Sequence, residues 1–290
     1  MTVDYAALSR LLGTRDCADA PCPACSPLRK PANRRKPVLR LWRIVERLIS
    51  YHCVHCEISG CVWESGKPGA ISPENLNEAR RQREALQAEA VAASRELARS
   101  IYARRRPVED SLGEVYFRQH RKITCRLPAT MGFLPGDGRY PPAVVMPFGP
   151  AHEVEPGLLA IRPEAIMAVH LTRLTSGGEK LAVNAKVMIG HGAQGFPLVV
   201  APPNDLLGLA ITEGVEDALS VHEATGLGAW AAGSASRLPA LADQVPGHVD
   251  CVTVLADDDA AGHRHAPALV ERLIQRGIHA EISILGTEAV

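Results

Sequence analysis

Aromatic residues are scarce in this sequence, and long hydrophobic runs are absent. Phe, Trp and Tyr make up 4% of the 290 residues although 46% are hydrophobic, so the cores must be mainly aliphatic. No hydrophobic run approaches the roughly 18 residues of a membrane-spanning helix. The opening residues, MTVDYAALSRLLG, lack the basic and then apolar stretches of an export signal. We therefore expect a cytoplasmic protein that does not associate with membranes.

The chain also lacks net formal charge, but its charges are unevenly distributed. Residues 1–125 hold 22 Lys and Arg against 14 Asp and Glu, whereas the remainder holds 10 against 18. A basic front half is typical of a protein that binds a polyanion, and an acidic back half is typical of one that holds a divalent metal ion. The alternative is a drift of charge along the chain without functional meaning.

Eight cysteines are present, and in a reduced protein they are expected to be metal ligands or buried thiols rather than disulfides. Two pairs have the CxxC spacing, and 27 residues separate Cys25 from Cys53. Each pair can direct two thiolates at one ion, and two pairs complete the tetrahedral sulfur shell that zinc prefers. The sequence therefore predicts a structural Zn²⁺ held by Cys22, Cys25, Cys53 and Cys56. Free thiols or a redox CxxC remain alternatives, and Cys17, Cys61, His52 or His55 could replace one ligand.

Two groups of cations lie in the basic half. The first lies between the cysteine pairs and could bind phosphates, with Trp42 available for base stacking; alternatively these residues only confer solubility and Trp42 is core. It comprises Arg29, Lys30, Arg34, Arg35, Lys36 and Arg40. The second lies farther along, and we favour a solvated helix face over contact with nucleic acid. It comprises Arg80, Arg81, Arg83, Arg95, Arg99, Arg104, Arg105 and Arg106.

Proline and glycine divide the chain into four expected regions. A short amphipathic helix is predicted within residues 1–15, and the stretch SGKPGAISPEN (65–75) is typical of a linker. Residues 76 to about 106 lack both Pro and Gly, which predicts one long helix ended by Pro107. Short strands are predicted at 143–147, 166–174 and 197–201. We therefore expect a zinc ribbon (1–66), a helical linker (67–106), a mixed α+β middle domain (107–203) and an α/β domain (204–290).

Regular alternation of strands and helices begins at residue 206. The runs LLGLAIT (206–212) and DCVTVLA (250–256) are typical of buried strands. Further strands are predicted at 228–232 and 279–285, and helices at 215–225, 237–243 and 261–276. Short connections between alternating elements predict an α/β fold, a Rossmann-like parallel sheet covered by helices.

Acidic residues follow two of these strands. Glu213 and Gly214 come directly after the first, and Asp257, Asp258 and Asp259 come after the second. Carboxyl ends of parallel strands meet at one edge of a sheet, where such folds build their sites. An Asp-x-Asp pair projects alternate side chains to the same side, so Asp257 and Asp259 can share an ion. Hard oxygen ligands suit Mg²⁺; acidic turns and helix caps are the alternative.

This arrangement resembles the Toprim pattern of strand–Glu-Gly–helix followed by strand–Asp-x-Asp, in ITEGVEDALSVHEATG (211–226) and VTVLADDDAAG (252–262). It looks most like the primase-type proteins of phages and mobile elements, which have a four-cysteine ribbon, a middle domain and then Toprim. VYFRQHRKI (115–123) resembles the segment that opens that middle domain, and MAVHLTRLTSGGEKLAVNAKVMIG (167–190) resembles its strand pair. The resemblance covers nearly the whole chain.

The resemblance implies roles for individual residues. Glu213 takes the place of the catalytic glutamate, and Asp257 and Asp259 take the place of the metal-binding pair. Asp217 matches a further acidic position, and Lys180 and Lys186 are counterparts of basic residues that face the metal site. The implied activity is synthesis of short RNA primers from nucleoside triphosphates on single-stranded DNA, with Mg²⁺ or Mn²⁺ in catalysis and Zn²⁺ in the ribbon.

Some features of replicative primases are missing. No further acidic motif is evident after Asp259, and neither SGKPG nor GHGAQG satisfies the GxxxxGK[ST] pattern of a helicase. Unwinding is therefore expected from a separate replicative helicase. Two other functions remain open: a Toprim nuclease that uses the same metals to activate water, and a non-catalytic zinc-ribbon/Toprim adaptor in replication or recombination. A topoisomerase is not expected, because 290 residues leave little room for its cleavage domain.

Overall fold

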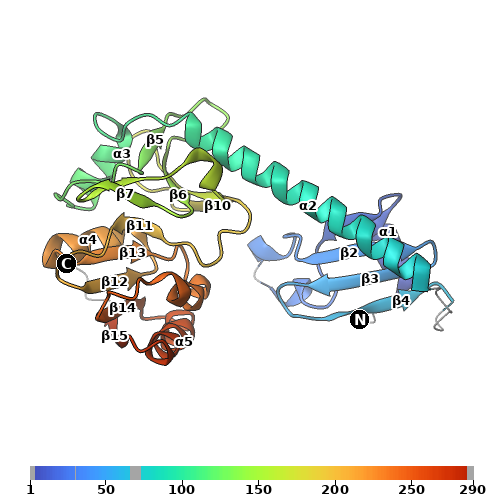
Figure 1. Cartoon of the computed structure of the whole chain (residues 1–290). Helices are drawn as coiled ribbons and strands as arrows, with labels where there is room; N and C mark the ends of the chain where they lie inside the picture. Colours follow the sequence, from blue (N-terminus) through green and yellow to red (C-terminus); the bar gives the residue numbers. More distant parts are fainter. Residues whose placement is uncertain (1–3, 30, 66–72, 286–290) are drawn as a thin grey trace. The chain divides into compact units, whose positions relative to one another are not determined.

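The computed structural model describes residues 4–29, 31–65 and 73–285 (Figure 1). It divides into two compact units, Met1–Glu89 and Ala90–Val290. Most of the predicted linker at 65–75, together with Lys30 and residues 286–290, lies outside the described residues. No helix in the described part of the chain is long and apolar enough to cross a membrane.

The first unit is a small antiparallel sheet with one helix packed on it. Helix α1 (Tyr5–Leu12) begins where the Asp4 carboxylate accepts a hydrogen bond from the Ala7 amide at 2.8 Å. Strands β1 (Cys17–Ala20), β2 (Leu39–Val45), β3 (Leu48–Cys53) and β4 (Ser59–Trp63) follow in their sheet order. Leu8 and Leu12 of α1 are buried against Leu41 and Ile49. The predicted N-terminal helix is confirmed.

The long helix α2 (Pro73–Ala103) confirms the helix predicted from residue 76. Its arginines lie in two kinds of environment. Arg80 and Arg81 are exposed, whereas Arg95 donates to the His191 carbonyl at 3.0 Å and Arg99 to the Glu164 carbonyl at 2.6 Å. Arg95 and Arg99 lie in the part of α2 that belongs to the second unit, and they contact backbone carbonyls of that unit instead of forming a solvated face. The side chain of Arg83 lies outside the described residues.

The middle lobe, residues 90–197, is built on a four-stranded antiparallel sheet. Its order is β10-β9-β6-β5, from β5 (Gly132–Leu134), β6 (Ala143–Phe148), β9 (Ala168–Arg173) and β10 (Lys186–Gly190). A separate hairpin joins β7 (His152–Glu155) and β8 (Leu158–Ala160), and a short helix α3 (Leu112–Val115) runs into a π-helical turn, Tyr116–His120. One sheet face packs on α2 through Ile101 and Tyr102. The mixed α+β prediction is confirmed.

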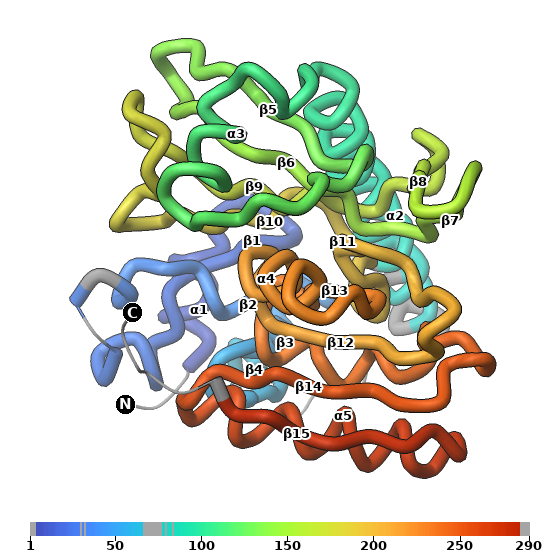
Figure 2. Tube along the Cα trace, turned by 90° about the vertical axis from the view of Figure 1, so that its left-hand side faces the viewer, coloured from blue at the N-terminus to red at the C-terminus, as the bar shows by residue number. Residues whose placement is uncertain are grey.

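The C-terminal lobe, residues 198–285, is an α/β sheet in the order β11-β13-β12-β14-β15 (Figure 2). Strands β12 (Gly208–Thr212), β13 (Gly228–Ala231), β14 (Cys251–Asp257) and β15 (His279–Leu285) are parallel, and β11 (Leu198–Ala201) is an antiparallel edge. Helix α4 (Val215–Thr225) and helix α5 (Gly262–Gln275) pack in different cores. The predicted fold class is confirmed; the helix predicted at 237–243 is a 3₁₀ segment, Ala235–Gln244.

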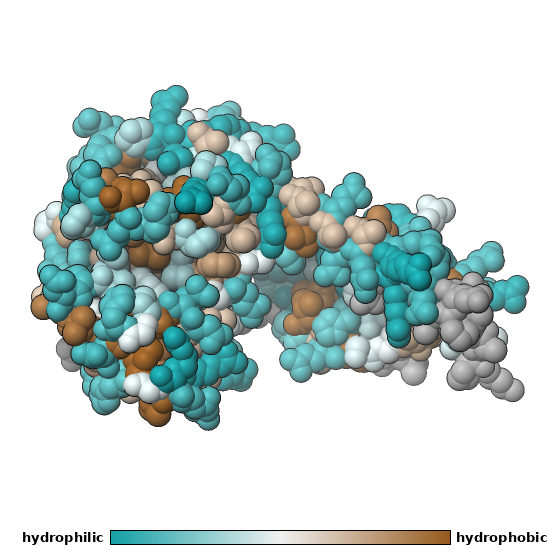
Figure 3. All heavy atoms as spheres, viewed as in Figure 1, coloured by the Kyte–Doolittle hydropathy of each residue, from teal (hydrophilic) through white to brown (hydrophobic). Residues whose placement is uncertain are grey.

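The two lobes of the second unit share one hydrophobic core. Met146 and Phe148 of β6 pack in the same cluster as Val215 and Leu219 of α4. The Arg237 guanidinium lies 4.4 Å from the centroid of the Phe148 ring and donates to the Phe196 carbonyl at 3.3 Å. Side chains on the outer face in Figure 3 are mostly hydrophilic, which fits burial of the hydrophobic residues between lobes and sheets.

Candidate functional site

The four predicted zinc ligands converge in the first unit. Cys22 and Cys25 lie in the turn after β1, Cys53 ends β3, and Cys56 lies in the turn that follows. All four sulfur atoms lie within 4.8 Å of one another. Cys22, Cys25 and Cys53 are buried in the same cluster as Leu8 and Leu12. Helix α1 therefore covers the cysteine cluster from the side of the sheet core.

The geometry of this cluster fits Zn²⁺. Tetrahedral Zn–S bonds of about 2.3 Å place sulfur atoms about 3.8 Å apart, and Cys22–Cys56 and Cys25–Cys53 are separated by 3.9 Å and 3.7 Å. Burial, and then the neighbouring thiols, raise the pKa of Cys25 to about 12. A divalent ion removes this penalty, because it binds the thiolates. None of the spare ligands Cys17, Cys61, His52 and His55 belongs to the group.

The ribbon cations are not equivalent. Arg40 forms a paired contact with the Asp19 carboxylate at 2.7 Å and 2.8 Å, so its charge is partly used within the sheet. Arg35 and Lys36 are exposed, and Trp42 is half-buried. Trp42 borders a hollow of about 380 Å³ together with Asp19, Arg40 and His52. Trp42 therefore lies outside the buried core of this unit.

The acidic residues of the C-terminal lobe meet at the carboxyl edge of its sheet, as predicted. Strands β12 and β14 are parallel neighbours in which Thr212 is paired with Leu255. Glu213 follows β12 directly, and Asp257 is the last residue of β14. The Thr212 hydroxyl donates to the Gly214 carbonyl at 2.7 Å, which fixes the turn after β12. Asp217 reaches this edge from the first turn of α4.

Two glycines allow the close approaches that this edge requires. A Cβ atom on Gly214 would lie 2.6 Å from Asp217 Oδ2 and 3.4 Å from Lys186 Nζ. A Cβ atom on Gly262 would lie 2.2 Å from the Asp257 carbonyl oxygen, a distance that real Cβ atoms do not adopt. Gly262 therefore lets α5 begin directly beside the end of β14.

Two of the carboxylates at this edge, Glu213 and Asp217, have a raised pKa. Burial, and then the charges of Asp257 and Asp259, raise the pKa of Glu213. Burial, Glu216 and Asp257 raise the pKa of Asp217. One carboxylate oxygen of Glu213 is buried and has no hydrogen-bond partner in the described structure. Crowded anions of this kind are stabilised by a cation, so the donor set fits a hard divalent ion such as Mg²⁺ or Mn²⁺.

The Asp-x-Asp pair is divided between two elements, because Asp257 ends β14 and the chain turns directly after it. Asp259 lies in the turn before α5, where its Oδ1 accepts hydrogen bonds from the Ala261 and Gly262 amides. These bonds lower the pKa of Asp259. Asp258 contacts His263 Nε2 at 2.7 Å. In the described residues, the carboxylate oxygens do not form a compact group of ligand atoms like that of the four cysteine sulfurs. Mg²⁺ does not require one, because it keeps water and substrate phosphates as ligands.

Lys180 and Lys186 also lie near this edge, where both contact Glu216. No pattern in the sequence indicated a role for Glu216. Lys180 Nζ lies 3.3 Å from Glu216 Oε1, and Lys186 Nζ lies 3.4 Å from Glu216 Oε2. The Tyr116 hydroxyl donates to Oε1 of the same carboxylate at 2.7 Å. Arg121 lies near this group, 6.0 Å from the Tyr116 ring centroid. Only the motif VYFRQHRKI pointed to Tyr116 and Arg121, and nothing singled out Glu216.

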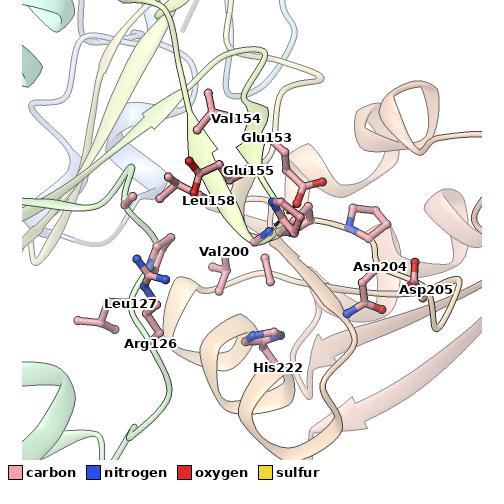
Figure 4. Close-up of a pocket in the computed structure, with 17 residues that line it drawn as sticks. Arg126, Leu127, Glu153, Val154, Glu155, Leu158, Val200, Asn204, Asp205 and His222 are labelled. Carbon is pink, nitrogen blue, oxygen red and sulfur yellow. Dashed lines mark hydrogen bonds between the residues drawn. The ribbon is translucent and has the colours of Figure 1, made fainter.

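A cavity of about 730 Å³ lies elsewhere, between the β7–β8 hairpin and the C-terminal lobe. Figure 4 shows Glu153 and Glu155 of the hairpin on one side and Asn204, Asp205 and His222 on the other. Asn204 and Asp205 precede β12, and His222 is in the last turn of α4. The cavity therefore opens at the amino edge of the sheet, away from the carboxylates.

Comparisons with known proteins match two regions of the chain to domain families. Residues 208–287 match the Toprim domain family, and residues 92–197 match a domain of unknown function, DUF7146. The C-terminal lobe is thus a Toprim domain, which follows a four-cysteine cluster in the same chain. No curated protein shows significant sequence similarity.

Two solved primase structures are similar to the chain. One is the primase fragment of the bacteriophage T7 primase-helicase, with 13% identity and a TM-score of 0.36, covering 92% of this chain and 89% of that chain. The other comprises the zinc-binding and RNA polymerase domains of the Aquifex aeolicus primase, with 12% identity and a TM-score of 0.39, covering 100% and 81%.

Proposed function

We propose that this protein is a primase-type nucleotidyltransferase that synthesises short RNA primers on single-stranded DNA with a divalent metal ion. One observation carries the proposal: the carboxylates of a Toprim domain lie at a sheet edge that also receives two lysines from the middle lobe. Anions that bind metal next to cations that bind phosphate are what nucleotidyl transfer requires. The four-cysteine cluster in the basic first unit adds a candidate template-binding element.

In this proposal Asp257, Asp259 and Glu213 hold the divalent ion, which supplies charge stabilisation for the leaving pyrophosphate and activates the attacking 3′-hydroxyl. Alternatively, Glu213 assists proton transfer from that hydroxyl instead of binding the ion. Asp217 adds negative charge beside the turn. Lys180 and Lys186 bind the nucleotide phosphates and orient them toward the carboxylates.

The first unit binds the template strand in the same proposal. Its exposed cations contact phosphates, and Trp42 is accessible enough to stack on a base. Unwinding of duplex DNA is assigned to a separate replicative helicase. Zn²⁺ has a structural role, because all four ligands are cysteines and three of them are buried in the ribbon core.

The direct test is incubation of the protein with single-stranded DNA, labelled ribonucleotides and Mg²⁺ or Mn²⁺, with the products sized. Asp257→Asn, Asp259→Asn and Glu213→Gln should each reduce primer synthesis by about 100-fold or more, since each removes a charge that holds metal. Mn²⁺ should partly rescue the single Asp variants. Asp258→Asn is the matched control, because Asp258 contacts His263 instead of the cluster, and its effect should be much smaller.

Other outcomes identify other functions. Shortening of the DNA without new RNA indicates a nuclease that uses the same carboxylates. Tight DNA binding without any metal-dependent turnover indicates an adaptor. Full primer synthesis by both Asp257→Asn and Glu213→Gln would refute the assignment of the active site.

A further inference from the structure

Glu216 is a buried carboxylate at the junction of the two lobes. It lies in the first turn of α4, with 3% of its surface exposed. Within the described residues, its carboxylate contacts three side chains of the middle lobe: Tyr116, Lys180 and Lys186. Tyr116 is 100 residues away along the chain. Glu216 therefore connects the Toprim helix to three separate segments of the other lobe.

The charge of Glu216 depends on these partners. Burial of a carboxylate alone raises its pKa, but the charges of Lys186 and Lys180 and the Tyr116 hydrogen bond outweigh burial and lower the pKa of Glu216 to about 2. The ionised carboxylate accepts a hydrogen bond from Lys180 at 3.3 Å, and it attracts the Lys186 ammonium as an ion pair at 3.4 Å. It is itself too buried to contact a substrate.

The two lysines, in contrast, are partly exposed. Their side chains retain 33% and 38% exposure, against 4% for that of Glu216. Lys186 Nζ lies 3.4 Å, and Asp217 Oδ2 lies 2.6 Å, from the point that a Cβ atom on Gly214 would occupy. Lysine side chains have many rotamers in solution. Contact with Glu216 restricts both ammonium groups to the neighbourhood of the acidic cluster while leaving part of each accessible.

We infer that Glu216 is a positioning residue, which holds Lys180 and Lys186 where they contact the phosphates of a nucleoside triphosphate bound at the carboxylates. This inference rests on the proposed function. Glu216 also offsets one of the two positive charges, so its removal has two opposite effects on an anionic substrate: the net charge becomes more attractive, while the lysines lose their orientation. Affinity and turnover therefore separate the two effects.

Glu216→Gln is the test variant, because it keeps the side-chain shape and removes the charge. We expect turnover in primer synthesis to fall by about 10- to 100-fold, without weaker apparent binding of the nucleotide. Glu216→Asp, which keeps the charge on a shorter side chain, should recover part of the loss. The effect of Glu216→Gln should largely vanish in a Lys180→Met/Lys186→Met background, since a residue that acts through the lysines is not additive with them.

Glu223→Gln is the matched control. Glu223 lies on the same helix and its carboxylate accepts a hydrogen bond from the Thr124 amide of the middle lobe at 2.9 Å, but it contacts neither lysine. Glu223→Gln removes a contact between the lobes that does not position a lysine. The turnover of this variant should stay within about twofold of wild type. If Glu223→Gln lowers turnover as much as Glu216→Gln, the role of Glu216 is only to join the lobes.

The experiment keeps the inference separate from the proposed function. If the wild-type protein makes no primer, the proposed function fails, and calorimetric binding of a non-hydrolysable nucleoside triphosphate with Mg²⁺ then tests Glu216. In that case Lys180→Met/Lys186→Met should weaken binding, and Glu216→Gln should change the binding enthalpy only when the lysines are present. If Glu216→Gln does not fold, Glu216→Asp takes its place. Wild-type turnover and binding in the folded variant overturn the inference.

Discussion

His170 is a single residue whose burial gives the second unit a dependence on pH. It lies on β9 with 5% of its surface exposed, and its Nε2 atom has no hydrogen-bond partner in the described structure. Its ring meets Phe148 edge-on, with centroids 6.5 Å apart. Burial, and then Lys186, lower the pKa of His170 to about 4; Lys180 and Arg237 act in the same direction and Glu216 opposes them. His170 is therefore neutral in the folded protein.

We predict that the second unit loses stability as the pH falls from about 6.5 toward 4. The unfolded chain binds the His170 proton first, because its pKa is near 6.5 while that of the folded state is about 4. The stabilisation is complete above about pH 7.5, and about 2.5 kcal/mol of it is lost by pH 4.5. Urea unfolding of wild type and His170→Gln across this range measures it, and the slope with pH should be shallower in the variant.

His248→Gln is the control for this prediction, because His248 is exposed. It should retain the wild-type slope. An identical pH dependence in wild type and His170→Gln would show that protonation of this residue is not coupled to unfolding.

At the scale of elements, the junction between β14 and α5 depends on Gly262. An added Cβ atom would meet the Asp257 carbonyl oxygen at 2.2 Å, so Gly262→Ala must displace either the strand end or the helix start. We expect a loss of about 1–3 kcal/mol in the free energy of unfolding, together with weaker divalent-metal binding. Gly247→Ala is the control, because nothing lies within 4 Å of its added atom, and its stability should stay within about 0.5 kcal/mol of wild type.

The ribbon is the element whose stability depends on a metal ion. Its sheet has four short strands, and the cysteines occupy much of its core. Zinc binding should therefore supply a large part of its folding energy. We predict one zinc ion per chain by elemental analysis. Chelation should abolish hydrogen-exchange protection in β2 and β3 and leave that of β12 and β14 intact. The prediction is contradicted if freshly purified, reduced protein contains no zinc. It is also contradicted if the ribbon keeps its hydrogen-exchange protection after zinc has been removed.

At the scale of the whole molecule, the excess of cations in residues 1–125 should control DNA binding. We predict that affinity for single-stranded DNA depends weakly on base sequence. It should fall by about tenfold or more between 50 and 200 mM salt, because Lys and Arg displace counterions. Arg34→Ala/Arg35→Ala/Lys36→Ala should reduce both affinity and salt slope. Deleting residues 1–66 should reduce template use more than metal binding.

Arg80→Ala/Arg81→Ala provides the comparison, since these two arginines are exposed on α2 and not on the ribbon. A smaller effect than that of the ribbon variant supports binding through the ribbon. Equal effects would mean that DNA binding requires only exposed cations, wherever they lie. If the affinity for DNA changes neither with salt nor in the ribbon variant, the electrostatic account is refuted.

Local sequence patterns predicted most elements of the C-terminal lobe and the residues at their ends. Strand runs that end at Thr212 and Ala256 placed Glu213 and Asp257 at one sheet edge, because parallel strands share an orientation. The two CxxC pairs likewise predicted the cysteine cluster. Each pair forms a short turn that directs two sulfur atoms at one point, and tetrahedral zinc coordination requires two such turns. The turn around Asp259 was missed, because an alternating pattern gives no sign that a carboxylate will accept hydrogen bonds from the next helix.

Contacts between distant segments depended on how the lobes pack. The meeting of Glu216 with Tyr116, Lys180 and Lys186 requires the middle sheet and α4 to share one core, and no spacing within any of these segments encodes that distance. The surroundings of His170 likewise combine both lobes, since its pKa responds to Lys186 of the middle lobe and to Glu216 and Arg237 of the C-terminal lobe. Periodicity and turn residues act over a few positions of the chain, so they specify elements and their ends. The surroundings of a side chain are set by every segment that packs against it.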